Sequence, residues 1–277
     1  MKALVDMDLI VYRVGAACDN WYYEFRGDRY DSSKELKSQL KRETKDTKEQ
    51  EQLYSQAERK RDPESWEETK SSVVTFTEQL ISEFDDYQGY ISGKGNFRHR
   101  YATILPYKGT RSDDTRPVHY DAIRQLLVDA YDAKVAQGME ADDCLGLAQT
   151  SADYLETCIV TVDKDLDMIP GVHYNWERDL KYQVDELDGV KKFYKQMLTG
   201  DMTDNILGLY GVGPKSALLK NIQLMEHEED MQGYIAEQYR ARFGSYDLKF
   251  LEENAKLLWI LRSDKQNPFV GGEYWKE

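Results

Sequence analysis

Acidic residues gather at three places along the chain. The first two places are the short clusters Glu140-Ala141-Asp142-Asp143 and Asp163-Lys164-Asp165. The third is the motif Gly200-Asp201-Met202-Thr203-Asp204-Asn205. A fold of alternating strands and helices would bring these segments to one crevice, at the carboxyl ends of parallel strands. Six or more carboxylates in one place repel each other strongly unless divalent cations lie between them. The pattern therefore predicts a metal-dependent enzyme that acts on a phosphate ester.

Two of these acidic positions directly follow apolar runs typical of buried strands. Asp6 follows Ala3-Leu4-Val5, and Asp163 with Asp165 follows the β-branched run 158–162. Acidic residues at such junctions also cap the next helix. For one junction alone the two interpretations are equally good, but all the clusters together favour metal ligation.

The middle cluster constrains its own geometry. On a regular helix Glu140 and Asp143 share a face while Asp142 points elsewhere. All three converge only if they form the first turn of a helix, and the preceding Gly138 permits that entry.

The ligand types predict the kind of metal. Carboxylate oxygens without His or Cys favour Mg²⁺ or Mn²⁺. The run from Asp163 to Asp167 resembles the start of a calcium-binding loop, but Met168 and Tyr174 stand where that loop needs Gly and Glu, so we reject it and expect only a capping role for Asp167. Two Mg²⁺ ions roughly 4 Å apart can activate water and hold a phosphodiester in line. We find no convincing Ser-His or Cys-His alternative in the sequence.

Composition limits the class of protein. The 277 residues are 40% hydrophobic and 32% charged, with no run long enough to span a bilayer and no secretion-signal layout at the N-terminus. The three cysteines have no paired spacing and the four histidines are scattered, so we expect reduced thiols, no zinc and a cytoplasmic protein, in the host cytoplasm if it is phage-encoded. The net charge of −14 opposes nonspecific DNA binding. Positive charge is nevertheless concentrated locally, at Arg98, His99, Arg100, Lys108, Arg111 and Arg116.

The order of elements predicts a parallel α/β sheet with helices on both faces. Strands are expected at residues 3–5, 90–91 and 158–162, and helices at 73–84, 120–133 and from about 140, with a mostly helical remainder from about 188. A charged stretch, about 28–70, is expected to be an exposed helical insertion without chemistry, because Leu36 and Leu40 keep helical spacing.

A glycine-rich segment predicts the substrate. It is Gly208-Leu209-Tyr210-Gly211-Val212-Gly213-Pro214-Lys215-Ser216-Ala217. Glycines let a hairpin between two helices approach a phosphate backbone, and Pro214 suits a first helical position. The amides at that helix start can bind phosphate with the help of Lys215. Preceded by Asp201 and Asp204, the segment indicates DNA.

Together these stretches resemble the flap endonuclease and 5′→3′ exonuclease superfamily, which includes the 5′-nuclease domain of bacterial DNA polymerase I. The chain is most similar to free-standing bacteriophage members. The resemblance spans most of the chain from Asp6 to Lys220 and also includes Val5-Asp6, Phe97-Arg98 and Tyr107-Lys108-Gly109-Thr110-Arg111.

The resemblance implies a PIN-like core over 1–187, an arch at about 94–117 and a helical region over 188–277, as one compact body. A helix–three-turn–helix element at about 193–222 would bind DNA through Gly211, Gly213, Lys215 and Ser216, with K⁺ at the hairpin. The two-metal cluster would comprise Asp6, Glu140, Asp142, Asp143, Asp163, Asp165, Asp201 and Asp204. Lys108, Arg111 and Arg98 would face the scissile phosphate. Tyr107 would stack on a base or be buried.

One departure from the family matters. The family places another Asp at the end of the second strand, where this chain has Ser92-Gly93. We hypothesise that Asp8, two residues after the first Asp, replaces the missing ligand. The charged insertion is a second departure, and it leaves the shape of the arch open.

Other functions remain as alternatives. The segment Leu4-Val5-Asp6-Met7-Asp8 also resembles the nucleophile strand of haloacid-dehalogenase phosphatases, but that alternative leaves the glycine hairpin unexplained. A DNA-end-binding protein with impaired catalysis is a third. Within the nuclease class, the sequence agrees equally with an exonuclease and with a flap endonuclease. The expected substrates are a duplex end, a 5′ flap or a junction, and an RNA primer strand is also possible as a partner. A monomer that serves DNA replication or recombination is expected from the resemblance.

Overall fold

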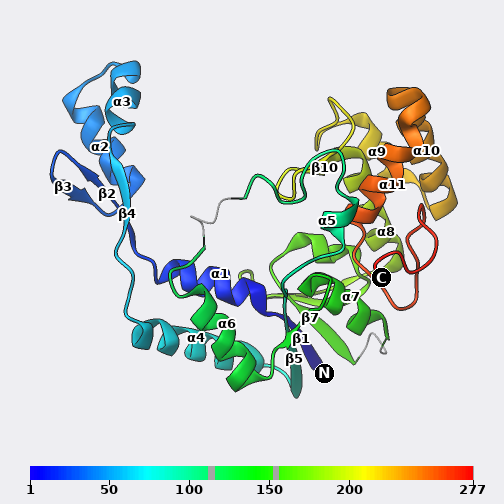
Figure 1. Cartoon of the computed structure of the whole chain (residues 1–277), viewed down its shortest axis with the longest axis horizontal. Coiled ribbons are helices and arrows are strands. Elements are labelled where there is room, and N and C mark those ends of the chain that lie inside the picture. The colour runs from blue at the N-terminus through cyan, green and yellow to red at the C-terminus, as the bar shows by residue number, and fades with distance from the viewer. Residues whose placement is uncertain (112–115, 152–155, 277) are drawn as a thin grey trace. The chain divides into compact units, whose positions relative to one another are not determined.

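The computed structural model describes residues 1–111, 116–151 and 156–276 (Figure 1). The chain divides into two compact units. Unit 1 comprises residues 1–9, 78–115 and 126–277, and unit 2 comprises residues 10–77 and 116–125. Residues on both sides of position 187 belong to unit 1, and the division at that position into a core and a helical region stays a prediction. All the predicted site residues also lie in unit 1.

The described part of unit 1 contains a six-stranded sheet in the order β6-β5-β1-β7-β8-β9. Its strands are β1 (Lys2–Asp6), β5 (Asp86–Ile91), β6 (Lys134–Val135), β7 (Thr157–Val160), β8 (Gly171–Asn175) and β9 (Leu180–Val184). All neighbouring pairs are parallel except β8 and β9. The predicted parallel α/β sheet is therefore confirmed, with an antiparallel edge strand that the sequence did not reveal.

The central strands are apolar because both of their faces are covered. Val5 of β1 and Ile159 of β7 are fully buried, and strands buried on both faces have nearly continuous apolar sequences. Helix α7 (Ala141–Ser151) packs on β1, β5 and β7. Asp6 is the last residue of β1, so the carboxyl edge of the sheet begins with an acidic side chain.

Helices form most of the C-terminal part of unit 1. Figure 1 shows α8, α9, α10 and α11 gathered together. The elements of this region are α8 (Glu186–Thr199), β10 (Gly200–Asp201), β11 (Ile206–Leu207), α9 (Ala217–Leu224), α10 (Glu228–Phe243), the 3₁₀ helix η3 (Gly244–Tyr246) and α11 (Asp247–Leu258). They enclose a core of large side chains that includes Phe193, Tyr239 and Trp259. Unit 1 also contains the short helix α5 (Arg98–Tyr101) and the 3₁₀ helix η2 (Lys164–Met168), which directly follows Asp163.

The charged insertion differs from its prediction. It forms a small α/β module in unit 2, with β2 (Trp21–Phe25), β3 (Asp28–Tyr30), α2 (Ser33–Glu43), α3 (Thr47–Tyr54) and β4 (Glu58–Arg61). The strands pair in the antiparallel order β3-β2-β4 (Figure 1). Leu36 and Leu40 do lie on a helix, and with Phe25 they form the module's own core. The sequence did not predict strand β4 because every residue in it is charged.

Three helices run from one unit into the other along the chain. They are α1 (Met7–Ala17), α4 (Trp66–Ile81) and α6 (Tyr120–Tyr131). The helices predicted at 73–84, at 120–133 and from about 140 are confirmed. Among the described residues, no helix has the length and apolar character needed to cross a membrane.

Candidate metal centre

The first group of carboxylates lies where β1 and β7 end. Asp6 ends β1, and the Oγ1 of Thr161, just after β7, donates to its Oδ2 at 3.1 Å. Asp163 caps η2, because its Oδ1 accepts a hydrogen bond from the Asp165 amide at 2.8 Å. A capping role for Asp163 therefore does not exclude metal ligation, which is the other interpretation of this junction.

A second group of carboxylates surrounds a small cavity. Its volume is about 30 Å³, which is enough for one or two water molecules or for a small ion. Its polar lining comes from several separate segments of unit 1, namely Arg98, Tyr107, Glu140, Asp142, Asp165, Gln196, Asp201 and Asp204. The three acidic motifs therefore meet at one ion-sized space.

The two groups repel each other and their own members. Burial and the charges of Asp8 and Asp163 raise the pKa of Asp6 to about 8. Burial and the charges of Asp6 and Asp163 raise the pKa of Asp142. Burial also raises the pKa of Asp201, with contributions from Asp204 and Asp165. Because each shift includes the charge of another carboxylate, the groups lie within electrostatic reach of one another.

Asp8 lies at the position where the sequence lacks an acidic residue. Its Oδ2 accepts a hydrogen bond of 2.9 Å from the amide of Ser92, the first residue after β5. A side chain from the start of α1 thus places a carboxylate at the end of the second predicted strand. This geometry supports the hypothesis that Asp8 replaces the missing Asp.

The segment 106–111 packs on the turn 201–205. The Lys108 amide donates to the Asp204 carbonyl at 2.9 Å, and the Asn205 Nδ2 donates to the Pro106 carbonyl at 2.9 Å. Lys108 and Asn205 both have left-handed backbones, with φ values of +55° and +60°. Such conformations are uncommon for residues other than glycine. Here both occur where the basic segment 106–111 contacts the acidic turn 201–205. The role of Asn205 was not predicted.

Two basic residues neutralise part of the second group. Lys108 pairs with Glu140, and Arg111 Nη2 lies 2.6 Å from Asp204 Oδ1. Burial alone would raise the pKa of Glu140, but the charges of Arg98 and Lys108 hold it at about 2. The sequence predicted that Lys108 and Arg111 face a scissile phosphate; in this structure they pair with carboxylates, and the contact with phosphate stays a prediction.

Tyr107 is buried, with 5% of its surface exposed. Its hydroxyl lies 2.9 Å from Glu140 Oε2 and 2.8 Å from Asp204 Oδ2. Burial and the charge of Glu140 raise its pKa well above the usual value, so the hydroxyl stays protonated and can donate. Of the two predicted roles, the structure therefore gives Tyr107 the buried one, and we correct the expectation that it stacks on a base.

Arg98 and Asp143 form a buried pair at the wall of the cavity, where Arg98 Nη1 also lies 3.8 Å from Glu140 Oε2. The guanidinium binds Asp143 through two hydrogen bonds, of 2.6 and 2.9 Å, and also donates to the Leu257 and Trp259 carbonyls. The Asp143 oxygens additionally accept from the amides of Glu140 and Leu261. Asp143 is fully buried and both its oxygens are engaged, so its predicted role as a metal ligand is corrected. Arg98 is likewise directed at Asp143 and not at a substrate phosphate.

Helix α8 supplies two partners that the sequence did not reveal. Lys192 Nζ lies 3.1 Å from Asp165 Oδ1, and the Gln196 Nε2 donates to the same oxygen at 2.7 Å. They are four residues apart and therefore share a helix face. That spacing was visible in the sequence, but nothing local linked it to Asp165, because the contact joins two distant segments.

The glycine-rich segment lies between β11 and α9. Gly211 has φ of +76° and, like Gly213, has open space at its Cβ position. Helix α9 begins at Ala217 and Ser216 caps it by accepting from the Leu218 amide at 3.3 Å, so Pro214 is not the first helical residue and that prediction was wrong. Lys215 is exposed. So is Tyr210, at 92%, which the sequence analysis had not selected.

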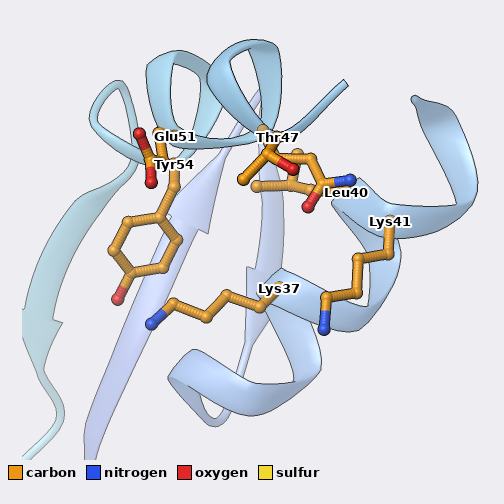
Figure 2. A pocket seen from close by; sticks show the side chains of 7 residues that line it. Lys37, Leu40, Lys41, Thr47, Glu51 and Tyr54 are labelled. Atoms are coloured by element: carbon orange, nitrogen blue, oxygen red, sulfur yellow. The ribbon is translucent and has the colours of Figure 1, made fainter. Parts of the chain in front are cut away.

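A separate hollow lies in the insertion module of unit 2. Its volume is about 420 Å³, and its lining includes Lys37 and Lys41 of α2 with Glu51 and Tyr54 of α3. Figure 2 shows Lys37 reaching towards Tyr54, and the Lys37 amine lies 4.7 Å from the centre of the Tyr54 ring. None of the predicted site residues lines this hollow.

The donor chemistry of unit 1 fits divalent cations, although the ligands are not yet arranged for them. Across residues 1–111, 116–151 and 156–276, no three His, Cys, Asp or Glu side chains are positioned to hold one ion. Three carboxylates of the second group, those of Glu140, Asp204 and Asp165, are paired with Lys108, Arg111 and Lys192. Hard oxygen donors around a space of ion size suit Mg²⁺ or Mn²⁺, provided that these cations move aside.

Comparison with known proteins gives partial matches. No family model matches the chain. It is 35% identical over 106 residues to DNA polymerase I of Rhizobium leguminosarum, an alignment that covers 34% of this chain. The same alignment covers 10% of that polymerase, so the chain spans about a tenth of the curated relative it matches.

Solved structures of bacteriophage T5 proteins have a similar chain course. One is a flap endonuclease in complex with DNA and metal ions, with 18% identity and a TM-score of 0.40, covering 68% of this chain and 90% of that one. Another is a 5′-exonuclease with bound zinc, with 14% identity and a TM-score of 0.45, covering 94% and 100%. At these identities and TM-scores the function of this chain must rest on its own side chains.

We expect the Arg98–Asp143 pair to stabilise the fold without binding metal. Asp143→Ala leaves a buried guanidinium without its partner and should lower the free energy of unfolding by about 3–5 kcal/mol. Replacing both residues, as Arg98→Met with Asp143→Leu, should recover part of that loss. Urea unfolding monitored by circular dichroism measures both. A stable Asp143→Ala variant that binds Mg²⁺ less tightly would contradict this assignment.

We expect metal-free protein to lose stability as the pH rises. Because the pKa of Asp6 is about 8 in the fold and 3.8 as the ordinary value, the unfolded chain ionises first, and the cost of folding grows between those two pH values. Asp6→Asn should make this fall in stability shallower and raise stability at pH 8 by about 1–3 kcal/mol. Thermal melts in chelator from pH 5 to pH 8 measure the effect, and equal slopes for the wild type and Asp6→Asn would count against it.

Proposed function

We propose that this chain is a divalent-metal-dependent nuclease that hydrolyses DNA phosphodiesters from or near a 5′ end, as a 5′→3′ exonuclease or flap endonuclease. The observation that supports this most is the convergence of Glu140, Asp142, Asp165, Asp201 and Asp204 on one ion-sized cavity. The partial match to DNA polymerase I agrees with it. Mg²⁺ or Mn²⁺ is the proposed cofactor, as two ions, and the products would have 5′ phosphates.

The two carboxylate groups would each hold one ion. Asp6, Asp8 and Asp163 would serve the first, and Asp165, Asp201 and Asp204 with Glu140 would serve the second. Asp142 lines the cavity of the second group but feels the charges of Asp6 and Asp163, and we assign it to the first ion. When bound, such a pair of ions supplies an activated water and neutralises the leaving oxygen. A protein nucleophile is not needed for this chemistry.

The basic residues of segment 106–111 would act on the substrate. Lys108 and Arg111 now pair with carboxylates, and ions bound to those carboxylates would release them towards a phosphate. Fixed positive charge there stabilises the charge that develops in the transition state. The Tyr107 hydroxyl would hold Glu140 and Asp204 in place, as a positioning group that does not touch the substrate.

The hairpin 208–216 would bind the DNA backbone away from the bond that is cut. Open space beside Gly211 and Gly213 permits close approach of a phosphate backbone, and Lys215 adds a positive charge. K⁺ is the proposed ion at this hairpin. Contacts of this kind fix position without selecting sequence, so a duplex end, a 5′ flap or a junction, with or without an RNA primer strand, would be accepted. A cytoplasmic monomer acting in DNA replication or recombination completes the proposal.

Loss of one ligand tests the catalytic assignment. Asp165→Ala should reduce cleavage at least about 100-fold, because even second-sphere partners of metal sites are worth 10–100-fold, while binding to DNA should persist. The matched control is Asp167→Asn on the same 3₁₀ turn, where the carboxylate accepts from the Tyr182 hydroxyl at 2.6 Å. Rates on 5′-labelled duplex, flap and closed circular DNA in Mg²⁺ give the answer.

Two outcomes would refute this proposal. One is near-normal cleavage by Asp165→Ala. The other is efficient cutting of closed circular duplex, which has no end to engage. Release of inorganic phosphate from small esters without DNA cleavage would instead support the phosphatase alternative.

Moving one carboxylate tests the role of Asp8. Asp8→Asn should weaken Mg²⁺ binding at least about ten-fold, since it removes a charge from the first group. Adding Ser92→Asp to that variant should restore much of the affinity, because Ser92 lies where the Asp8 side chain now reaches. Isothermal titration with Mg²⁺ measures both variants. Wild-type affinity in Asp8→Asn alone would exclude Asp8 as a ligand.

A further inference from the structure

A second pocket in unit 1 has the opposite charge to the carboxylate cavity. It encloses about 620 Å³ and lies between the segment before α5, the loop that leads into α7 and the C-terminal residues. Its lining comprises Gly95, Asn96, Phe97, Arg100, Gln137, Gly138, Met139, Trp275 and Lys276. Two of these side chains are cationic and none is acidic, although the chain as a whole has a net charge of −14. A pocket of this charge suits an anion.

The aromatic and polar groups of the lining narrow the ligand further. Trp275 is only partly buried and lines the pocket together with Arg100, whose Nη2 donates to the Trp275 carbonyl at 3.3 Å. Lys276 pairs with Glu273 at 2.6 Å, but both side chains are more than half exposed, so that pair contributes little and can exchange. An indole next to two cations provides stacking for a base and charge for a phosphate.

One buried donor in the pocket wall lacks an acceptor. Asn96 accepts from the Arg98 amide through its Oδ1 at 2.9 Å. Its Nδ2 is buried and has no hydrogen-bond partner among the residues that the structure describes. A buried amide donor without an acceptor is unfavourable. A ligand oxygen that reached this part of the wall would satisfy it.

The pocket and the carboxylate cavity share two pieces of backbone. Asn96 and Phe97 line the pocket, while Arg98 lines the cavity; Gly138 and Met139 line the pocket, while Glu140 lines the cavity. The two pieces are joined directly, because the Phe97 amide donates to the Gly138 carbonyl at 2.9 Å. One or two residues of chain span at most about 7 Å. A strand held in the pocket would therefore lie within a nucleotide or two of the cavity.

We propose that this pocket, defined by Asn96, Arg100, Trp275 and Lys276, binds one nucleotide of the DNA strand next to the bond that is cut. Its phosphate lies against Arg100 and Lys276, and its base stacks on Trp275. This inference rests on the proposed nuclease function and adds a subsite that neither the carboxylates nor the hairpin 208–216 provide. The phosphate is either the terminal 5′ phosphate or an internal one, and substrates that differ only in that group distinguish the two.

The affinity of pocket variants for DNA tests this proposal. Trp275→Ala, and separately Arg100→Ala with Lys276→Ala, should weaken binding of a fluorescent DNA oligonucleotide about ten-fold, measured without divalent ions. The double cation variant should also lower the slope of log affinity against log salt by about 1–2. Lys249→Ala and Tyr246→Ala are the matched controls, since Tyr246 ends η3, Lys249 lies on α11, and both side chains are exposed and line neither the pocket nor the cavity.

Tryptophan fluorescence gives a second readout that does not depend on catalysis. DNA should quench the wild-type protein, and Trp275→Phe should lose part of that quenching. If the terminal phosphate is bound, a 5′-phosphorylated oligonucleotide should bind wild type several-fold tighter than its 5′-hydroxyl counterpart, and Arg100→Ala with Lys276→Ala should abolish the difference. Equal binding of both oligonucleotides, with the cation variants still weakened, assigns an internal phosphate.

Failure of the pocket can be separated from failure of the nuclease proposal. If wild type cleaves and binds DNA while the pocket variants behave like Lys249→Ala, the pocket proposal is overturned and the nuclease stands. If wild type neither binds nor cleaves DNA, the nuclease proposal fails and the pocket proposal fails with it.

Discussion

Mutual repulsion among buried carboxylates is the constraint on which the rest of unit 1 depends. The pKa of Asp6 is raised to about 8 by burial and by the charges of Asp8 and Asp163, and burial and neighbouring carboxylates likewise raise those of Asp142 and Asp201. Such an arrangement opposes folding unless positive charge is supplied. Because repulsion raises the free energy of the metal-free site, cations that relieve the repulsion should bind it tightly and stabilise the fold.

The chain supplies part of that positive charge from segments that are distant in sequence. Lys108 and Arg111 arrive from the segment after α5, and Lys192 from the middle of α8. Arg98 neutralises Asp143 inside the core, and in doing so ties α5 and α7 to the backbone after α11. The same side chains therefore stabilise the metal-free fold and surround the place where substrate and ions would bind.

Much of this could be predicted from the sequence, because strand ends and acidic residues coincide. Apolar runs before Asp6 and Asp163 predicted two central strands, and their parallel pairing follows from the helices between them. The roles of Arg98, Asp143 and Tyr107 were not predictable, since a charged or phenolic side chain gives no local indication of whether it is buried. Lys192 and Gln196 were missed for the related reason that their partner, Asp165, lies on another element.

The insertion module shows a different limit. Leu36 and Leu40 indicated a helix, but β4 consists only of charged residues that pair with β2, and two of its arginines cover the Trp21 ring at 3.9 and 4.4 Å. Charged side chains with long aliphatic stems can cover an aromatic surface as apolar residues do. Pattern alone therefore predicts an exposed helix where the chain forms a small sheet.

The most direct test of this account is to locate the ions themselves. Crystals grown or soaked with Mn²⁺ and measured at its absorption edge should show two anomalous peaks per chain, one between Asp6, Asp142 and Asp163 and one between Asp165, Asp201 and Asp204. Lys108 and Arg111 should have moved away from their carboxylates. Crystals in which the carboxylates keep their present salt bridges and no Mn²⁺ lies among them would contradict the central claim.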